Sequence, residues 1–111
     1  MRDDRLRLSD MQLAVARIRT FTAAGRAGFF ASELVQAAVC FELVSLGEAA
    51  GRVSDAVRHS HPKVPWNELT DLRNSMTHEC FRVDPDALWE FVDRRLDALD
   101  RQLRVATKGG N

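Results

Sequence analysis

The chain has 111 residues, of which 45% are hydrophobic and 29% are charged. This length and composition fit one globular domain with its own core and exclude an intrinsically disordered chain. Its 16 Lys and Arg balance its 16 Asp and Glu, so no overall positive field draws the protein onto nucleic acid or an anionic membrane. We expect a single domain over residues 1–107 and a disordered tail over residues 108–111.

The sequence predicts a cytoplasmic protein that does not contact a membrane. No apolar run approaches the roughly 18–20 residues of a membrane span, and the charged start Met1–Arg5 lacks the apolar region of a secretory signal. The two cysteines, Cys40 and Cys80, stand in no metal-binding or redox spacing. We expect them to be reduced thiols, with a disulfide as the less favoured alternative.

Charge is unevenly distributed along the chain. Residues 11–32 carry three arginines and no acid, whereas residues 82–100 carry three arginines against six Asp and Glu. Two solvated helix faces of opposite sign explain this pattern. The functional alternative is a basic face for phosphates and an acidic face for another protein.

Four segments place apolar residues three or four positions apart, the spacing of amphipathic helices, and no run alternates like a strand. The first helix is expected over residues 3–24 and ends at Gly25, a residue suited to a helix C-terminus. The second is expected over residues 32–58, has Ser32 as its N-cap and carries the strongest periodicity.

The third helix is expected over residues 66–79, with Trp66 filling the core at its start. The fourth begins with Asp84 as N-cap and Pro85 at the first helical position. Short loops join the four segments, so the sequence predicts an all-α, four-helix up-and-down bundle.

Glycines and histidines outside the apolar stripes have structural interpretations. Gly47 and Gly51 lie four positions apart in the second helix, and small residues at this spacing predict a tight helix crossing. His59 and His61 resemble a metal-binding pair, but no third ligand lies near them in the sequence. We therefore expect a surface loop there, and neither a metal nor another cofactor.

Chemically active residues gather between Arg73 and Cys80. Arg73 and His78 are five positions apart, so on an ideal helix their side chains point roughly 140° apart. Either Arg73 swings toward His78, or two copies of the chain bring such groups together across a two-fold axis. The structural alternative is an exposed Arg and a His that interacts with the helix C-terminus.

The chain resembles the HepT-type ribonuclease toxins of the HEPN superfamily. That family carries Arg-x4-His-x-Tyr at this place, usually beginning Arg-Asn as Arg73 and Asn74 do here. Two further stretches match in the same order: Leu46–Ala49 is similar to Ile-Gly-Glu-Ala, and Val64–Trp66 is similar to Ile-Pro-Trp. The resemblance spans nearly the whole chain.

This resemblance implies a homodimeric HEPN bundle that is the toxin of a type VII toxin–antitoxin system and cleaves RNA without a metal. Arg73 and His78 carry over as the catalytic pair, with Asn74 in support. An imidazole can deprotonate a ribose 2′-OH for attack on the adjacent phosphate near neutral pH. A guanidinium can hold that phosphate and neutralise the charge that develops on it.

Cys80 stands where the family has its Tyr, and the chain contains no Tyr. In the family, a partner nucleotidyltransferase antitoxin of the MntA type adds AMP to that Tyr and silences the toxin. Cys80 cannot accept AMP stably in the same way. Control by binding alone, modification of another residue and a sequence altered at this position are the alternatives. The proposed chemistry does not need the phenol, although activity is reduced if Tyr helps to hold RNA.

A second hypothesis is a catalytically impaired binding subunit that docks a nucleotidyltransferase. It is motivated by Cys80 and by the zero net charge. It is also motivated by Ala37, Phe41 and Glu42, which replace polar residues that the family has at these positions. A stand-alone helical regulator is a third.

Several phenylalanines lie off the main apolar stripes and predict a subunit interface. The alternative is that they cover the ends of the bundle. They are Phe29, Phe30, Phe41 and Phe81.

Overall fold

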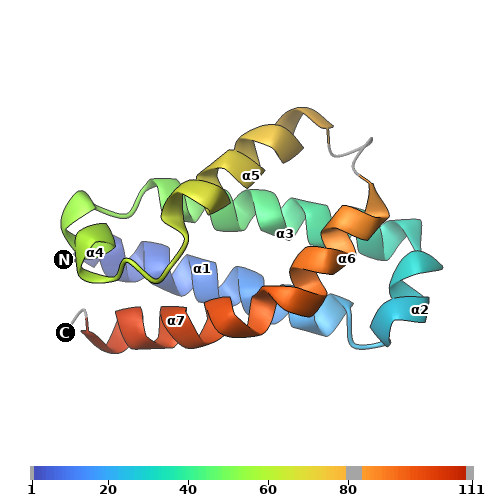
Figure 1. Ribbon diagram of the computed structural model, residues 1–111, viewed down its shortest axis with the longest axis horizontal. Coiled ribbons are helices and arrows are strands. Elements are labelled where there is room, and N and C mark those ends of the chain that lie inside the picture. Colours follow the sequence, from blue (N-terminus) through green and yellow to red (C-terminus); the bar gives the residue numbers. More distant parts are fainter. Residues whose placement is uncertain (1, 80–83, 110–111) are drawn as a thin grey trace.

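The computed structural model describes residues 2–79 and 84–109, and these ranges are helical apart from short turns and connections (Figure 1). The all-helical prediction is confirmed, although the segments are more numerous than expected. They are α1 (Arg2–Phe21), α2 (Gly25–Phe30), α3 (Glu33–Gly51), α4 (Asp55–Ser60), α5 (Trp66–Glu79), α6 (Pro85–Arg94) and α7 (Leu96–Gly109).

Helix α3 lies at the centre of the fold, packed against α1 on one side and α5 on the other. Helix α7 packs against α1, and Figure 1 shows these two helices running side by side. Most of the apolar positions that show helical spacing in the sequence are buried, whereas Leu6 is 55% exposed. Five others are only partly buried and pack against the core: Phe21, Val35, Val57, Leu72 and Val92. The largest fully buried side chains are Phe29, Leu8, Met11, Ile18, Leu43, Leu46, Leu69 and Leu103.

By length and composition alone, α3 meets the requirements of a membrane-spanning helix, with a mean hydropathy of 1.4. The expectation that no apolar segment approaches the length of a membrane span was therefore wrong, because α3 has 19 residues. Its position between α1 and α5 accounts for this apolar character, because Val39, Leu43, Leu46 and Ala50 are completely buried inside the bundle.

The expected second helix is broken after Gly51, which corrects the prediction of one helix over residues 32–58. A new helix, α4, starts at Asp55, and the Ser54 hydroxyl caps it by accepting the Val57 N–H at 3.3 Å. The buried Asp4 carboxylate of α1 fixes this junction, because it accepts the Ser54 N–H and the Ser54 O–H, both at 2.8 Å. The bond from the Ser54 N–H is the main reason that the pKa of Asp4 is lowered, while burial opposes the shift.

We predict that Asp4→Ala lowers the free energy of unfolding by about 1–3 kcal/mol near neutral pH, because it leaves the partly buried Ser54 N–H without its acceptor. Since the pKa of Asp4 lies below the ordinary value of 3.8, its contribution is complete above that pH and is lost as the pH falls through the lower folded-state value. Urea unfolding of both proteins at about pH 7 and pH 2 measures this difference. Asp10→Ala is the control, since exposed Asp10 makes one 3.5 Å contact with Arg7 and its loss should cost below about 1 kcal/mol. An equal effect of both substitutions at neutral pH would contradict the role of Asp4.

The turn after α1 depends on Gly25, which has φ +81°, a conformation that favours glycine. The short helix α2, which the sequence analysis did not predict, follows directly. Its Phe29 ring is buried and lies 5.2 Å from Phe30 and 5.3 Å from Trp89 of α6, centroid to centroid. Phe29 and Phe30 therefore cover one end of the bundle, whereas Phe41 is 63% exposed. Phe81 lies outside the described residues.

The N-caps predicted at Ser32 and Asp84 are confirmed: Ser32 accepts the Val35 N–H at 3.1 Å, and Asp84 accepts the Asp86 N–H at 3.0 Å. The expected fourth helix divides into α6 and α7 at Arg95. Helix α7 continues to Gly109, into the stretch expected to be a tail.

The two regions of opposite charge meet each other in part. Arg19 of α1 binds Asp97 at 2.7 Å and Asp100 at 3.3 Å on α7. This arginine is thereby balanced within the fold, which argues against a basic face built from residues 11–32.

The expectation of two reduced thiols is wrong for Cys40, which is buried and disulfide-bonded. Cys80 lies outside the described residues.

Candidate active site

Helix α5 carries Arg73, Asn74 and His78 of the motif, and the Val64–Trp66 stretch fixes its start. Val64 and Trp66 are both buried. The Trp66 indole donates its Nε1–H to the His61 carbonyl at 3.0 Å, and the Pro65 carbonyl accepts the Leu69 N–H at 3.0 Å. The predicted core position of Trp66 is confirmed, and the result is a rigid first turn from which the rest of α5 projects.

The tight crossing predicted for the paired glycines occurs between α3 and α5 at Gly47. A Cβ added there would lie 2.2 Å from the Arg73 Cβ and 2.6 Å from the Leu69 carbonyl oxygen. A side chain at Gly47 therefore cannot be accommodated without separating the helices. At Gly51 the same atom would meet only the Thr70 methyl at 3.5 Å, an ordinary contact.

We predict that Gly47→Ala destabilises the fold by about 1–3 kcal/mol, because the added methyl overlaps α5 backbone and the base of Arg73. Gly51→Ala should be neutral or stabilising by up to about 1 kcal/mol, since alanine favours a helix over glycine and space is available. Thermal or urea unfolding of the two variants provides the comparison. A Gly47→Ala protein as stable as the Gly51→Ala protein would rule out the close crossing.

The Arg73 guanidinium binds the Glu48 carboxylate across this crossing. Oxygen Oε1 of Glu48 accepts from Arg73 Nε at 3.1 Å and from Nη2 at 2.5 Å, and Asn74 Oδ1 accepts from Nη1 at 2.9 Å. The other Glu48 oxygen lies 3.7 Å from Nη2 of Arg52. Hydrogen bonding and charge from Arg73 lower the pKa of Glu48, with a smaller effect from Arg52, so this carboxylate stays ionised.

The structure brings together part of the predicted site. The Asn74 side chain accepts a hydrogen bond from Arg73 Nη1 at 2.9 Å, while the supporting role that the resemblance implies for Asn74 stays a prediction. His78 belongs to the last turn of α5, but its side chain lies outside the described part of the structure, as does the whole of Cys80. The pairing of Arg73 with His78 therefore stays a prediction.

Glu48 is the site residue that the sequence analysis missed. In the sequence, Glu48 belongs to the Leu46–Ala49 stretch, whereas Arg73 belongs to the Arg-x4-His motif. The structure shows that these two stretches face each other, because Gly47 and Glu48 contact the base and the head of the same arginine. Their joint match to one family was the signal that could have linked them.

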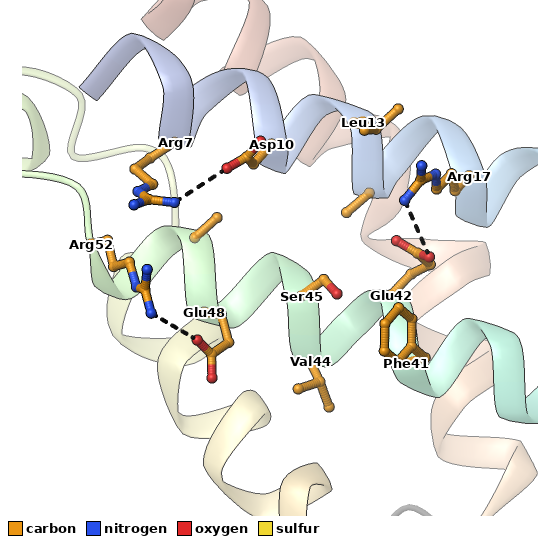
Figure 2. A pocket seen from close by; sticks show the side chains of 12 residues that line it. Arg7, Asp10, Leu13, Arg17, Phe41, Glu42, Val44, Ser45, Glu48 and Arg52 are labelled. Atoms are coloured by element: carbon orange, nitrogen blue, oxygen red, sulfur yellow. Dashed lines mark hydrogen bonds and ion pairs between the residues drawn. The ribbon is translucent and has the colours of Figure 1, made fainter. Parts of the chain in front are cut away.

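A groove between α1 and α3 opens beside this pair, and Glu48 is one of its lining residues (Figure 2). Figure 2 shows Arg7 and Arg52 at the same end of the groove as Glu48, and Arg17 and Glu42 at the other end. Exposed Phe41 and Leu13 also line it. The groove thus combines charges of both signs with apolar side chains.

Glu42 occupies an unusual place in this groove, because it is 4% exposed and its nearest cation, Arg17, lies 3.9 Å away. Burial raises the pKa of Glu42, and the charge of Arg17 only partly offsets this effect. An ionised Glu42 therefore costs stability, and it adds no cation with which to bind phosphate.

Among the described residues, no group of three or more His, Cys, Asp or Glu side chains lies close enough together to hold a metal ion. The surface loop expected at these histidines is wrong for His59, which is an exposed residue of α4, whereas His61 is the C-cap of that helix.

Comparison with known proteins adds to this geometry. The sequence model of a family described as "Ribonuclease HepT-like" matches residues 11–106. "Putative RNase MJ1380" of Methanocaldococcus jannaschii is 29% identical over 77 residues, which are 69% of this chain and 71% of that protein. "Probable ribonuclease HepT" of Thermococcus cleftensis is 31% identical over 71 residues, 64% of either chain.

A third relative, "Putative RNase TTE0752" of Caldanaerobacter subterraneus subsp. tengcongensis, is 32% identical over 59 residues, 53% of either chain. The aligned part of the chain thus spans between 53% and 71% of these three relatives. No solved structure matches the chain significantly.

Proposed function

The chain belongs to the HepT-like ribonuclease family, and from this premise we propose that it is a metal-independent RNA endonuclease acting as the toxin of a type VII toxin–antitoxin system in the cytoplasm. The observation that carries the proposal is the arrangement of Arg73. Its base is fixed against Gly47, its head is held by Glu48 and Asn74, and the family's histidine position, His78, follows on the same helix.

In the proposed reaction, His78 removes the proton from a ribose 2′-OH, and the resulting oxygen attacks the adjacent phosphorus. The bond from phosphorus to the 5′-oxygen breaks, and that oxygen takes up a proton as it leaves. Arg73 binds the non-bridging oxygens and stabilises the negative charge that increases on them. Asn74 supports Arg73 through the hydrogen bond to Nη1.

We predict that the purified chain cleaves RNA in the presence of EDTA and that His78→Ala lowers the cleavage rate by about 10²- to 10⁴-fold, the range for loss of a general acid–base group. Single-turnover cleavage of a labelled RNA, with melting curves to verify folding, measures this effect. His59→Ala is the matched control, because His59 is exposed on α4. Cleavage that persists in a folded His78→Ala protein would remove His78 from the mechanism.

The groove face of α3 is the surface that we propose for a homodimer. Leu34, Phe41 and Glu48 are seven positions apart, so they lie along one side of the helix. Leu34 is 79% exposed and Phe41 is 63% exposed. The groove carries charges of both signs, which a second copy related by a two-fold axis can match. A copy seated there would lie beside Glu48 and Arg73 and could complete an active-site cleft.

We predict that Phe41→Glu converts a dimer into a monomer and abolishes RNA cleavage, because it places a charge in the apolar part of this interface. Val105→Glu is the control, since Val105 on α7 is equally exposed at 63% and lies on a helix that does not line the groove. Light scattering gives the mass, and the RNA assay gives the activity. A monomeric wild-type protein would contradict both the dimer and the shared cleft.

A cognate nucleotidyltransferase antitoxin is the proposed partner, and Cys80 bears on how it acts. Because Cys80 replaces the tyrosine that accepts AMP in the family, inhibition by direct binding is the simplest mode of control for this chain. The second candidate function, a binding subunit of reduced activity, is favoured by exposed Phe41 beside buried Glu42, which present no cation to RNA. A tight complex with the partner, with no RNA turnover at any protein concentration, would support that candidate.

A further inference from the structure

We propose that Glu48 is a positioning residue for Arg73 in RNA cleavage, a role that rests on the proposed nuclease function. Glu48 itself does not contact the phosphate in this proposal. It acts by holding the guanidinium in one orientation before RNA arrives, so that less conformational freedom is lost when the phosphate binds.

The geometry supports positioning because Arg73 is held at both ends of its side chain. The Cβ lies against Gly47, where no other residue type would leave room for it. A guanidinium offers one planar edge through Nε and Nη2 and another through Nη1 and Nη2. Glu48 Oε1 accepts from both nitrogens of the first edge, at 3.1 Å and 2.5 Å. The orientation of the guanidinium plane is therefore set by a residue of the neighbouring helix.

The charges around Glu48 keep the cluster attractive to a phosphodiester. Its second oxygen faces Arg52 at 3.7 Å, so among the described contacts of Glu48 one carboxylate meets two guanidinium groups. Glu48 is 40% exposed at its side chain and Arg73 35%, so RNA can approach the pair from solvent. A carboxylate that competed with phosphate for Arg73 would act as an inhibitor instead, and the two roles predict opposite effects of removing it.

The test compares Glu48→Ala and Glu48→Gln with Glu68→Ala in the full-length protein. Glu68 is a matched control because it is 48% exposed at its side chain and binds Arg95 through two carboxylate contacts, with Nη1 at 2.5 Å and Nη2 at 2.9 Å. We expect Glu48→Ala to lower kcat by about 10- to 100-fold, because a misplaced Arg73 guanidinium slows the chemical step. KM should not rise, because loss of a negative charge does not weaken RNA binding. Glu48→Gln should fall between wild type and Glu48→Ala, because an amide oxygen still accepts from Nε. Glu68→Ala should keep the wild-type kcat.

A kcat of Glu48→Ala at or above the wild-type value would overturn the proposal, as would a change confined to KM. A second measurement does not need activity. It is the exchange of the Arg73 Nε proton with water, followed by nitrogen-edited NMR, and the signal is identified by its loss in Arg73→Lys. This proton should exchange slowly in the wild type and in Glu68→Ala, and fast in Glu48→Ala. Fast exchange in the wild type would refute the positioning of Arg73 by Glu48 even if RNA is cleaved. Slow exchange in a wild type that does not cleave RNA would instead refute the nuclease function, and with it a role of Glu48 in cleavage, while the hold of Glu48 on Arg73 would stand.

Discussion

The candidate site depends on the close approach of α3 and α5 at Gly47. The absence of a side chain there lets the base of Arg73 rest against the α3 backbone, and the next residue, Glu48, then meets the head of the same arginine. Leu46 and Ala49, on either side, are buried in the core. Four consecutive residues of α3 thus act at a single helix crossing: two pack in the core, one leaves space for α5, and one provides the carboxylate.

Helix α3 serves the core and the surface at once. The side that includes Val39, Leu43 and Leu46 is buried among the other helices, whereas Leu34 and Phe41 point away from the bundle. This distribution explains why a central helix of a charged protein has the hydropathy of a membrane span. It also places the exposed apolar side chains of Leu34 and Phe41 on the same side of α3 as the carboxylate that binds Arg73.

Local signals in the sequence predicted the starts of α3 and α6, because a capping side chain such as Ser32 or Asp84 acts on its own helix. The break after Gly51 was not predictable in this way, since it is fixed by Asp4, fifty positions earlier in the chain. The same holds for Glu48, whose partner lies on another helix. The sequence placed Arg73 and Asn74 next to each other in one motif, but the carboxylate that binds Arg73 is visible only when α3 and α5 are packed together.

The contact between Asp4 and Ser54 also has a practical meaning for anyone who trims this protein. The region shared with the family begins at Met11, so a fragment cut to that boundary would lack the carboxylate that joins α1 to the α3–α4 junction. From this junction the chain runs through α4 to the turn that starts α5, the helix of Arg73. Removal of the first ten residues would therefore loosen the connection that leads into the helix of Arg73, although no residue of that helix had been changed.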